Sequence, residues 1–332
     1  MEAIGKTLQF DGISRRVRCF GHIINLVVKA LLFGHDSEAF EKNMSGDTFV
    51  DSKRHEEWRR KGPIGKLHNL VRVIHKSDLL TNELRKLQQD HFDSSEDPAI
   101  RVKKPVDVVL DNLTRWLSQL YMISRALRLR PFLEDLWFKH RTEWNMDVRK
   151  GKRKESGMPL YLQDESELTE KDWDIIQLFG DVLQDFEDAL LVLEGDGQFR
   201  PRKGGRIEAC GSIWDVFLSF QHLLDKLETW KATAERYPDP EHFRINVNLG
   251  WKKLNHYYEL LDESPVYYAS VAIHPAYRWD YFEHLWVDTP EWIDRAKASV
   301  QNLWETEYKS LGVSADNEEP FQKRRKAFAT AF

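Results

Sequence analysis

Apolar residues recur at a spacing of three to four positions along most of the chain, and this pattern predicts amphipathic α-helices. Residues 18–33 are apolar almost all round and are followed by Gly34, a common helix C-terminal signal, so we expect a buried helix there. Pro63 marks the start of a second helix that runs to about Gln89. No strand alternation of useful length follows residue 110. The fold is therefore expected to be mainly α.

The middle of the chain predicts a long amphipathic helix after a short extended piece at residues 106–110. Pro131 is expected to kink or split this helix, because proline removes a backbone donor and clashes with the preceding turn. Further on, Thr169 and Asp172 precede an apolar period with the three-residue separation of a capping box. They predict the start of a helix that runs to about Glu194.

Polar and glycine-rich stretches between these periods predict loops. Residues 35–55 are polar, and residues 195–211 are rich in glycine and basic side chains. Residues 149–154, RKGKRK, form a basic linker. Such a run is either a solvated loop, a phosphate contact or a nuclear-import signal.

Composition places the chain among globular proteins. It has 332 residues, 41% of them hydrophobic, with 12 Trp, 18 Phe and 10 Tyr, which is enough apolar material for one large core or two smaller ones. The net charge of −5 gives no global basic field, so any DNA contact has to come from local patches. Residues 23–33, the longest apolar run, fall short of the roughly 20 residues that span a bilayer, so no membrane partner is expected.

The two cysteines, Cys19 and Cys210, offer no disulfide framework, and we expect a reducing, intracellular compartment. Cys19 and His22 have the spacing of half a zinc site, but no second Cys/His pair accompanies them, so no metal is expected. The alternative is a small buried cysteine and a hydrogen-bonded histidine at the start of an apolar helix.

Few other residues point to chemistry. Trp116 can stack a base and Arg115 can hold a phosphate, although most of the 12 tryptophans are expected in the core. Asp107 and Asp111 are the nearest thing to a carboxylate pair, and a structural or capping role is expected for them. No Walker loop, dinucleotide-binding glycine pattern, nucleophile elbow or His-Glu metalloprotease signature is present.

Five strings, taken in order, resemble fungal transposases of the hAT superfamily and cover most of the chain. These strings are RRVRCFGHIINLVVKALLFG (15–34), WRRKGPIGKLHNLV (58–71), DNLTRWLSQLYMISRALRLR (111–130), GSIWDVF (211–217) and NLGWKKLNHYYELLDESPVYYASVAIHPAYRWDYFE (248–283).

The resemblance implies a fold and a division of the chain. Family members have a ribonuclease H-like domain with an Asp, Asp, Glu triad, interrupted by a large helical insertion between the second Asp and the Glu. The resemblance therefore assigns residues 1–34 to a remnant of that domain, residues 35–310 to the helical insertion and residues 311–332 to a polar tail.

The resemblance also implies site residues. It puts His22 beside the family's active site and gives Cys19 a structural role, and it makes Arg115 and Trp116 the pair that handles a nucleotide flipped out as a hairpin forms. DNA contacts are expected from the residues of these strings that combine charge, polarity or an aromatic ring: Lys61, Lys66, Thr114, Arg115, Trp116 and His22.

The chain departs from the family pattern in two ways. Leu117 replaces the asparagine that usually follows the Arg-Trp pair, which removes a polar side chain there. More seriously, Met1 follows the expected position of the second Asp and Phe332 precedes the expected Glu, so the whole triad is missing. The intact family implies Mg²⁺ or Mn²⁺, but this chain is expected to hold no cofactor and to be catalytically inactive alone.

The prediction is therefore a transposase-derived, DNA-binding protein of the nucleus, whose partner is a transposon end or a flanking hairpin. The alternatives are a protein-interaction module that associates with intact transposase subunits, a truncated product without function, and a host-domesticated regulator that competes at transposon ends. The interaction module would expose the apolar residues Val27, Val28 and Leu31, left uncovered by a missing sheet.

Overall fold

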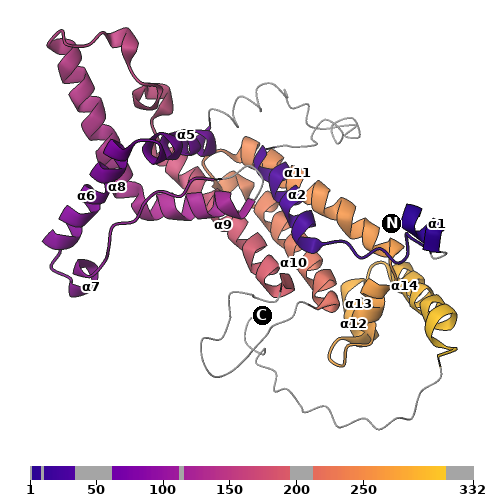
Figure 1. The fold of residues 1–332 in the computed structure, drawn as a ribbon. Helices are drawn as coiled ribbons and strands as arrows, with labels where there is room; N and C mark the ends of the chain where they lie inside the picture. Colours follow the sequence, from indigo (N-terminus) through magenta and orange to yellow (C-terminus); the bar gives the residue numbers. More distant parts are fainter. Residues whose placement is uncertain (1, 9–10, 34–61, 112–115, 195–211, 312–332) are drawn as a thin grey trace. The chain divides into compact units, whose positions relative to one another are not determined.

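The computed structural model describes residues 2–8, 11–33, 62–111, 116–194 and 212–311, and within these ranges every regular element is helical (Figure 1). The mainly α prediction is confirmed. The α-helices are α1 (Glu2–Leu8), α2 (Phe20–Phe33), α5 (Pro63–His75), α6 (Asp78–Ser94), α7 (Pro98–Arg101), α8 (Trp116–Arg149), α9 (Glu170–Glu194), α10 (Ile213–Ala232), α11 (Pro240–Glu259), α12 (Val266–Ala272), α13 (Arg278–Leu285) and α14 (Pro290–Leu303).

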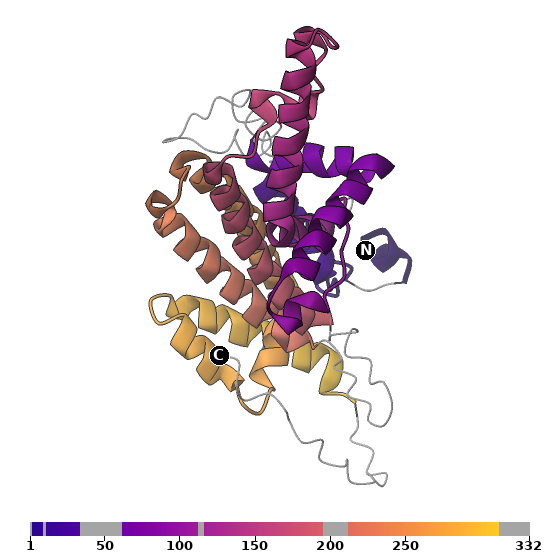
Figure 2. The same ribbon diagram turned by 90° about the vertical axis from the view of Figure 1, so that its left-hand side faces the viewer.

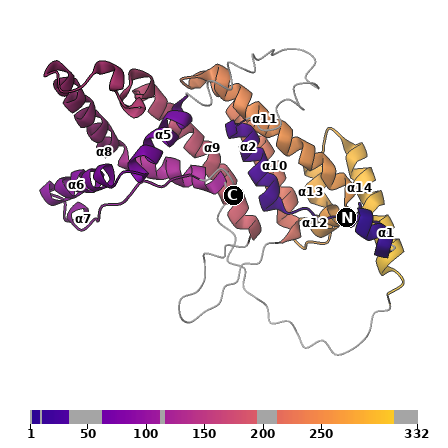
Figure 3. The ribbon, with the colours of Figure 1, turned by 45° about the horizontal axis from the view of Figure 1, so that its top comes forward.

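The chain divides into two compact units, Met1–Tyr267 and Tyr268–Phe332. The centre of the first unit is a closed ring of four helices, in which α2 contacts α9 and α11, and α10 contacts the same two helices. Figures 1 and 3 show α2 lying along α11. The ring encloses side chains that are at most 2% exposed, among them Ile24, Val27, Val28, Leu31, Phe179, Phe186, Phe220, Leu223, Phe243, Val247 and Leu254.

The burial of α2 overturns one expectation. Val27, Val28 and Leu31 are each 0% exposed, so they form no uncovered apolar face. The close approach of α11 accounts for this, because a Cβ added to Gly250 would lie 3.2 Å from both Cβ and Cδ1 of Leu31. Glycine at this position lets the two helix backbones come together, and the neighbouring helices cover the face that a sheet was expected to cover.

A second group of helices, α5, α6 and α8, joins the ring through contacts of α5 and α8 with α9. The single helix expected from Pro63 to about Gln89 is instead two, because Ser77 caps a new start: its side chain accepts a hydrogen bond from the Leu80 backbone N–H. Conversely, α8 continues through Pro131 without splitting. None of the described helices combines the length and apolar character needed to cross a membrane.

The capping box at the start of α9 is confirmed. The backbone N–H of Thr169 donates to the Asp172 carboxylate at 2.9 Å, and the Asp172 N–H donates back to the Thr169 hydroxyl at 3.3 Å. The helix runs from Glu170 to Glu194, as expected. The loops predicted at residues 35–55 and 195–211 lie outside the described residues, as does Cys210.

The second unit contains α13, α14 and an aromatic cluster. Phe282, which is fully buried, lies 4.9 Å between ring centroids from Trp286, and Trp286 lies 5.8 Å from Trp292. Beyond α14, Trp304 and Tyr308 stack with nearly parallel rings at 6.4 Å, and their side chains are half exposed.

Candidate nucleic-acid interface

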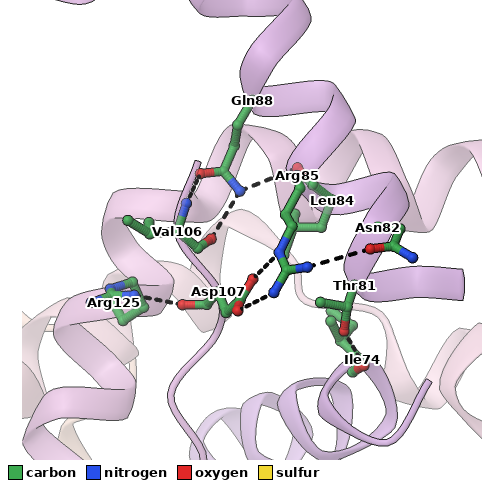
Figure 4. Close-up of polar contacts among 9 residues, drawn as sticks. All are labelled: Ile74, Thr81, Asn82, Leu84, Arg85, Gln88, Val106, Asp107 and Arg125. Carbon is green, nitrogen blue, oxygen red and sulfur yellow. Dashed lines mark hydrogen bonds and ion pairs between the residues drawn. The ribbon is translucent and has the colours of Figure 1, made fainter. Parts of the chain in front are cut away.

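An extended segment, residues 104–111, leads towards the Arg-Trp pair and is fixed to α6 by a buried glutamine. The Gln88 side-chain amide donates to the Val106 carbonyl at 3.0 Å, and the Val106 N–H donates to the Gln88 Oε1 at 2.9 Å (Figure 4). Gln88 is 0% exposed, so both polar groups of its amide are paired in a dry environment. The segment is thus held as a strand would be, by a reciprocal pair of hydrogen bonds to its backbone.

Two arginines fix the next residue. Arg85 on α6 donates to both carboxylate oxygens of Asp107, at 2.7 and 2.6 Å, and Arg125 on α8 donates to the Asp107 carbonyl at 2.6 Å (Figure 4). The hydrogen bonds from Arg85 lower the pKa of the Asp107 carboxyl below its ordinary value of 3.8. Asp107 therefore has the structural role expected of it, as a link between two helices.

Asp111, at the end of the segment, belongs to a buried polar network. Its carboxylate accepts a hydrogen bond from the His68 Nδ1 of α5 at 2.5 Å and another from the Gln119 side-chain amide of α8. The Asp111 side chain is 3% exposed and Gln119 is 1% exposed. Because Asp111 precedes residues 112–115 and Gln119 lies in the first turn of α8, this network joins the two flanks of the short segment that leads into the helix.

The expected DNA-contacting residues Thr114 and Arg115 lie in this short segment, outside the described residues, and so does Lys61. Trp116 is the first residue of α8, but its side chain is also outside the description. The described structure therefore gives the frame of the site, which consists of Asp107, Asp111 and Gln119 with their partners.

Cys19 and His22 are placed differently from the core alternative considered for them. Both are exposed, Cys19 just before α2 and His22 in its first turn, so neither is the buried residue that the apolar context predicts. Phe20, Ile23 and Ile24 turn to the core instead, and His22 is the one exposed residue among the α2 side chains that the structure describes. Within the described part of the chain, neither Cys19 nor His22 is hydrogen-bonded to the Asp111 network.

Lys66 is engaged inside the protein. Its ammonium donates to the Glu167 carbonyl at 2.9 Å and to the Asp172 carboxylate at 3.0 Å, and its side chain is 18% exposed. It neutralises the carboxylate that caps α9 and so ties α5 to that helix start. In this arrangement its ammonium does not face a phosphate in solvent.

The carboxylates near the site do not fit a divalent metal. Two-metal phosphoryl transfer needs acidic side chains whose oxygens are available to the ions. The carboxylate of Asp107 is held by Arg85, and that of Asp111 is held by His68 and Gln119. Across the described ranges, no group of three or more His, Cys, Asp or Glu residues is arranged to hold a metal ion.

Five residues of this frame were missed in the sequence: His68, Arg85, Gln88, Gln119 and Arg125. The sequence could have indicated Gln88, because this residue lies in the apolar stripe of α6. It is buried together with the apolar residues of that stripe, Leu80, Leu84 and Phe92. A polar residue at a core-facing helical position implies a buried hydrogen-bond partner. His68 and Gln119 carry no comparable signal, because their partner Asp111 is distant in the sequence from the first and separated by the short segment from the second.

The Arg85–Asp107 ion pair predicts a pH dependence of stability. Because the pKa of Asp107 is lowered in the folded protein, the pair stabilises the fold above about pH 3.8 and this contribution is lost as the pH falls further. Both side chains are nearly half exposed, so solvent screening keeps the effect small. Arg85→Gln should therefore lower the free energy of unfolding only slightly at pH 7, measured by urea denaturation.

The control for this prediction is the same variant at pH 3. The difference between Arg85→Gln and the wild type should be smaller there, because below pH 3.8 the stabilisation by the ion pair is progressively lost as the Asp107 carboxylate takes up a proton. An unchanged difference at pH 3 would mean that Arg85 stabilises the protein through packing and not through its charge.

Comparisons of the chain with family models, with curated proteins and with solved structures find no match.

Proposed function

We propose that this chain is a DNA-contacting helical part of a hAT-type transposase, and that Arg115 and Trp116 make the contact. The observation that carries the proposal is the hydrogen bond between Gln119 and Asp111, the two residues that flank positions 112–118 and therefore the pair. The ordered resemblance of residues 111–130 to the family supplies the identity of the pair.

A fixed frame favours this function for a physical reason. Binding a distorted DNA end orders the protein groups that contact it, and that ordering costs free energy unless the groups are already held. The flanks of the segment are held by charged and buried hydrogen bonds on both sides. An indole at its C-terminal edge can stack on a flipped base, and a guanidinium beside it can hold a phosphate.

Under this proposal, Trp116→Ala should weaken binding to a hairpin with an unstacked base by about 1–3 kcal/mol, because one base–aromatic stack is lost. Fluorescence anisotropy with a labelled hairpin oligonucleotide measures the change. The matched control is Trp292→Ala, which removes a partly exposed tryptophan from the second unit and should leave affinity unchanged. Equal affinities for wild type and Trp116→Ala would contradict the proposal.

The proposal includes no DNA cleavage by this chain alone. The carboxylates of the described frame are engaged by Arg85, His68 and Gln119, so none is available to hold the Mg²⁺ or Mn²⁺ that the intact family implies. Incubating the purified chain with transposon-end DNA and either ion should give no nicked or hairpin product. Product formation above a no-protein control would overturn this part of the proposal.

The finer fold and the location are also proposals. The assignment of residues 1–34 to a remnant of a ribonuclease H-like domain rests on the resemblance of residues 15–34, and so does the nuclear location that DNA contact implies. Imaging the fluorescently tagged chain in fungal cells tests the location.

The protein-interaction alternative now rests on different residues. Val27, Val28 and Leu31 are buried and give it no support, but Trp304, Tyr308 and Leu311 in the second unit are 53%, 50% and 64% exposed. Where such side chains gather into one contiguous apolar patch, the patch is typical of a protein contact. Gel filtration of the wild type against Trp304→Ser/Tyr308→Ser tests it: a wild-type oligomer that the double variant abolishes would favour this alternative.

A further inference from the structure

Five basic residues within six positions stand at the last residue of α8 and directly after it, where the chain turns. We call Arg149, Lys150, Lys152, Arg153 and Lys154 the basic tip; all five are exposed. Figure 2 shows this end of α8 projecting beyond the helices that α8 contacts. The proposed DNA contact at Arg115 and Trp116 does not use these residues, since they lie at the opposite end of the same helix.

The turn that presents the basic tip has a defined backbone. Gly151 adopts a φ of +70°, in the left-handed region that favours glycine, and it ends the helix. Its N–H donates to the Val148 carbonyl at 2.9 Å, and the Lys152 N–H donates to the Asp147 carbonyl at 2.9 Å. These are the two hydrogen bonds of a Schellman motif, so the lysines on either side of Gly151 are carried by an ordered turn.

One arginine of the tip is held by two side chains, whereas the other four cations have no acidic partner among the described residues. The Arg153 guanidinium lies 4.6 Å from the ring centroid of Trp144 and pairs with Asp147 at 3.3 Å. In the part of the chain that the structure describes, no acidic side chain pairs with the remaining cations, which are Arg149, Lys150, Lys152 and Lys154. Glu155 is the one acidic residue next to them in sequence. The tip is therefore a local positive surface on a chain whose net charge is −5.

From this arrangement we infer that the basic tip is a second nucleic-acid contact, which binds the phosphate backbone of duplex DNA without reading its sequence. Unpaired lysines on an ordered turn suit a duplex, which offers a phosphate about every 1.7 Å along its axis, and each contact releases a counterion. The inference rests on the proposed function and deepens it: the Arg-Trp end of α8 would hold the distorted end and the basic tip the flanking duplex.

Two other polyanionic partners fit less well. Binding to a bilayer would need apolar side chains that insert between the basic ones, but residues 149–157 contain none. An import receptor that binds an extended basic peptide would need Arg153 released from Trp144 and Asp147. The observations therefore favour a rigid phosphate contact over both.

The test compares two triple variants of the full chain. The tip variant is Lys150→Gln/Lys152→Gln/Lys154→Gln, and the control variant is Lys6→Gln/Lys171→Gln/Lys309→Gln, which removes the same charge from exposed lysines outside both proposed contacts. The probe is an undistorted 30-base-pair duplex, whose binding is measured by anisotropy from low to moderate salt. Matching circular dichroism spectra establish that both variants are folded.

The tip variant should bind the duplex about tenfold more weakly at low salt, and the slope of log K against log salt should become shallower by about 3, one for each lost phosphate contact. The control variant should match the wild type. Equal losses in both variants would mean that only net charge matters and would overturn the inference. Binding of the wild type to phosphatidylserine vesicles but not to the duplex would overturn it as well.

The duplex separates this inference from the proposed function. Trp116→Ala should not change duplex binding, because an undistorted duplex has no unstacked base to offer. If the tip variant binds the duplex more weakly but Trp116→Ala binds the hairpin as the wild type does, the inference about the basic tip stands and the function proposed for the Arg-Trp pair is rejected. If only Trp116→Ala loses affinity, the inference about the basic tip alone is rejected.

Discussion

Leu31→Ala is expected to lower the free energy of unfolding by about 2–5 kcal/mol, which is the range for a leucine removed from a closed core. Leu31 is 0% exposed and lies against Gly250, so the truncated side chain leaves a space that no neighbouring side chain at that contact can fill. The measurement is urea denaturation followed by circular dichroism. The size of the loss reports directly whether α2 is an internal helix of this fold.

Leu79→Ala is the matched control for this prediction. Leu79 is also a helical leucine, in the first turns of α6, but it is 64% exposed, so its truncation should change the free energy of unfolding by no more than about 0.5 kcal/mol. If Leu31→Ala lowered the free energy of unfolding as little as Leu79→Ala, α2 would have an uncovered apolar face. A much larger loss for Leu31→Ala is expected only if α2 lies inside the closed ring of helices.

The elements that sequence reasoning predicted well are those with local causes. The α2 helix and the capping box at Thr169 and Asp172 each follow from residues within a few positions of one another, and both are confirmed. Local causes also explain the missed break at Ser77, since a serine followed by Asp78 is itself a helix-start signal that a continuous apolar period obscured.

The elements that were predicted poorly depend on contacts between distant residues. Cys19 and His22 are exposed because α2 turns other residues to its partners, and the partners α9 and α11 come from much later in the chain. Lys66 looks like a free cation in the sequence, yet Glu167 and Asp172 engage its ammonium. A basic residue in a sequence motif therefore predicts a phosphate contact poorly, because a carboxylate from a distant part of the chain can already pair with it.

The frame of the candidate site illustrates the same limit. The sequence gives Asp111 only a capping or structural role, whereas in the fold this residue joins three elements: the extended segment, α5 and α8. The residues it joins, His68 and Gln119, attract no attention in the sequence. The frame on either side of residues 112–115 therefore consists partly of side chains that motif reasoning would not select.

Asp111→Ala is expected to lower the free energy of unfolding by about 2–4 kcal/mol, since it leaves the amide of Gln119 and the Nδ1 of His68 without an acceptor in a largely dry site. The proposed function adds a second consequence. With the flanks of residues 112–115 no longer joined, hairpin affinity should fall even at temperatures where the variant stays folded, and anisotropy measures that fall.

Two further variants separate the charge of Asp111 from its hydrogen bonds. Asp111→Asn keeps an oxygen for His68 and brings an amide that can donate to the Oε1 of Gln119, a buried oxygen without a hydrogen-bond partner in the described structure. It should therefore retain more stability and more hairpin affinity than Asp111→Ala. Asp174→Ala, which truncates an exposed aspartate of α9, should change neither quantity. If Asp111→Ala loses stability but binds the hairpin as the wild type does, the network is structural only, and the position of the Arg-Trp pair does not depend on it.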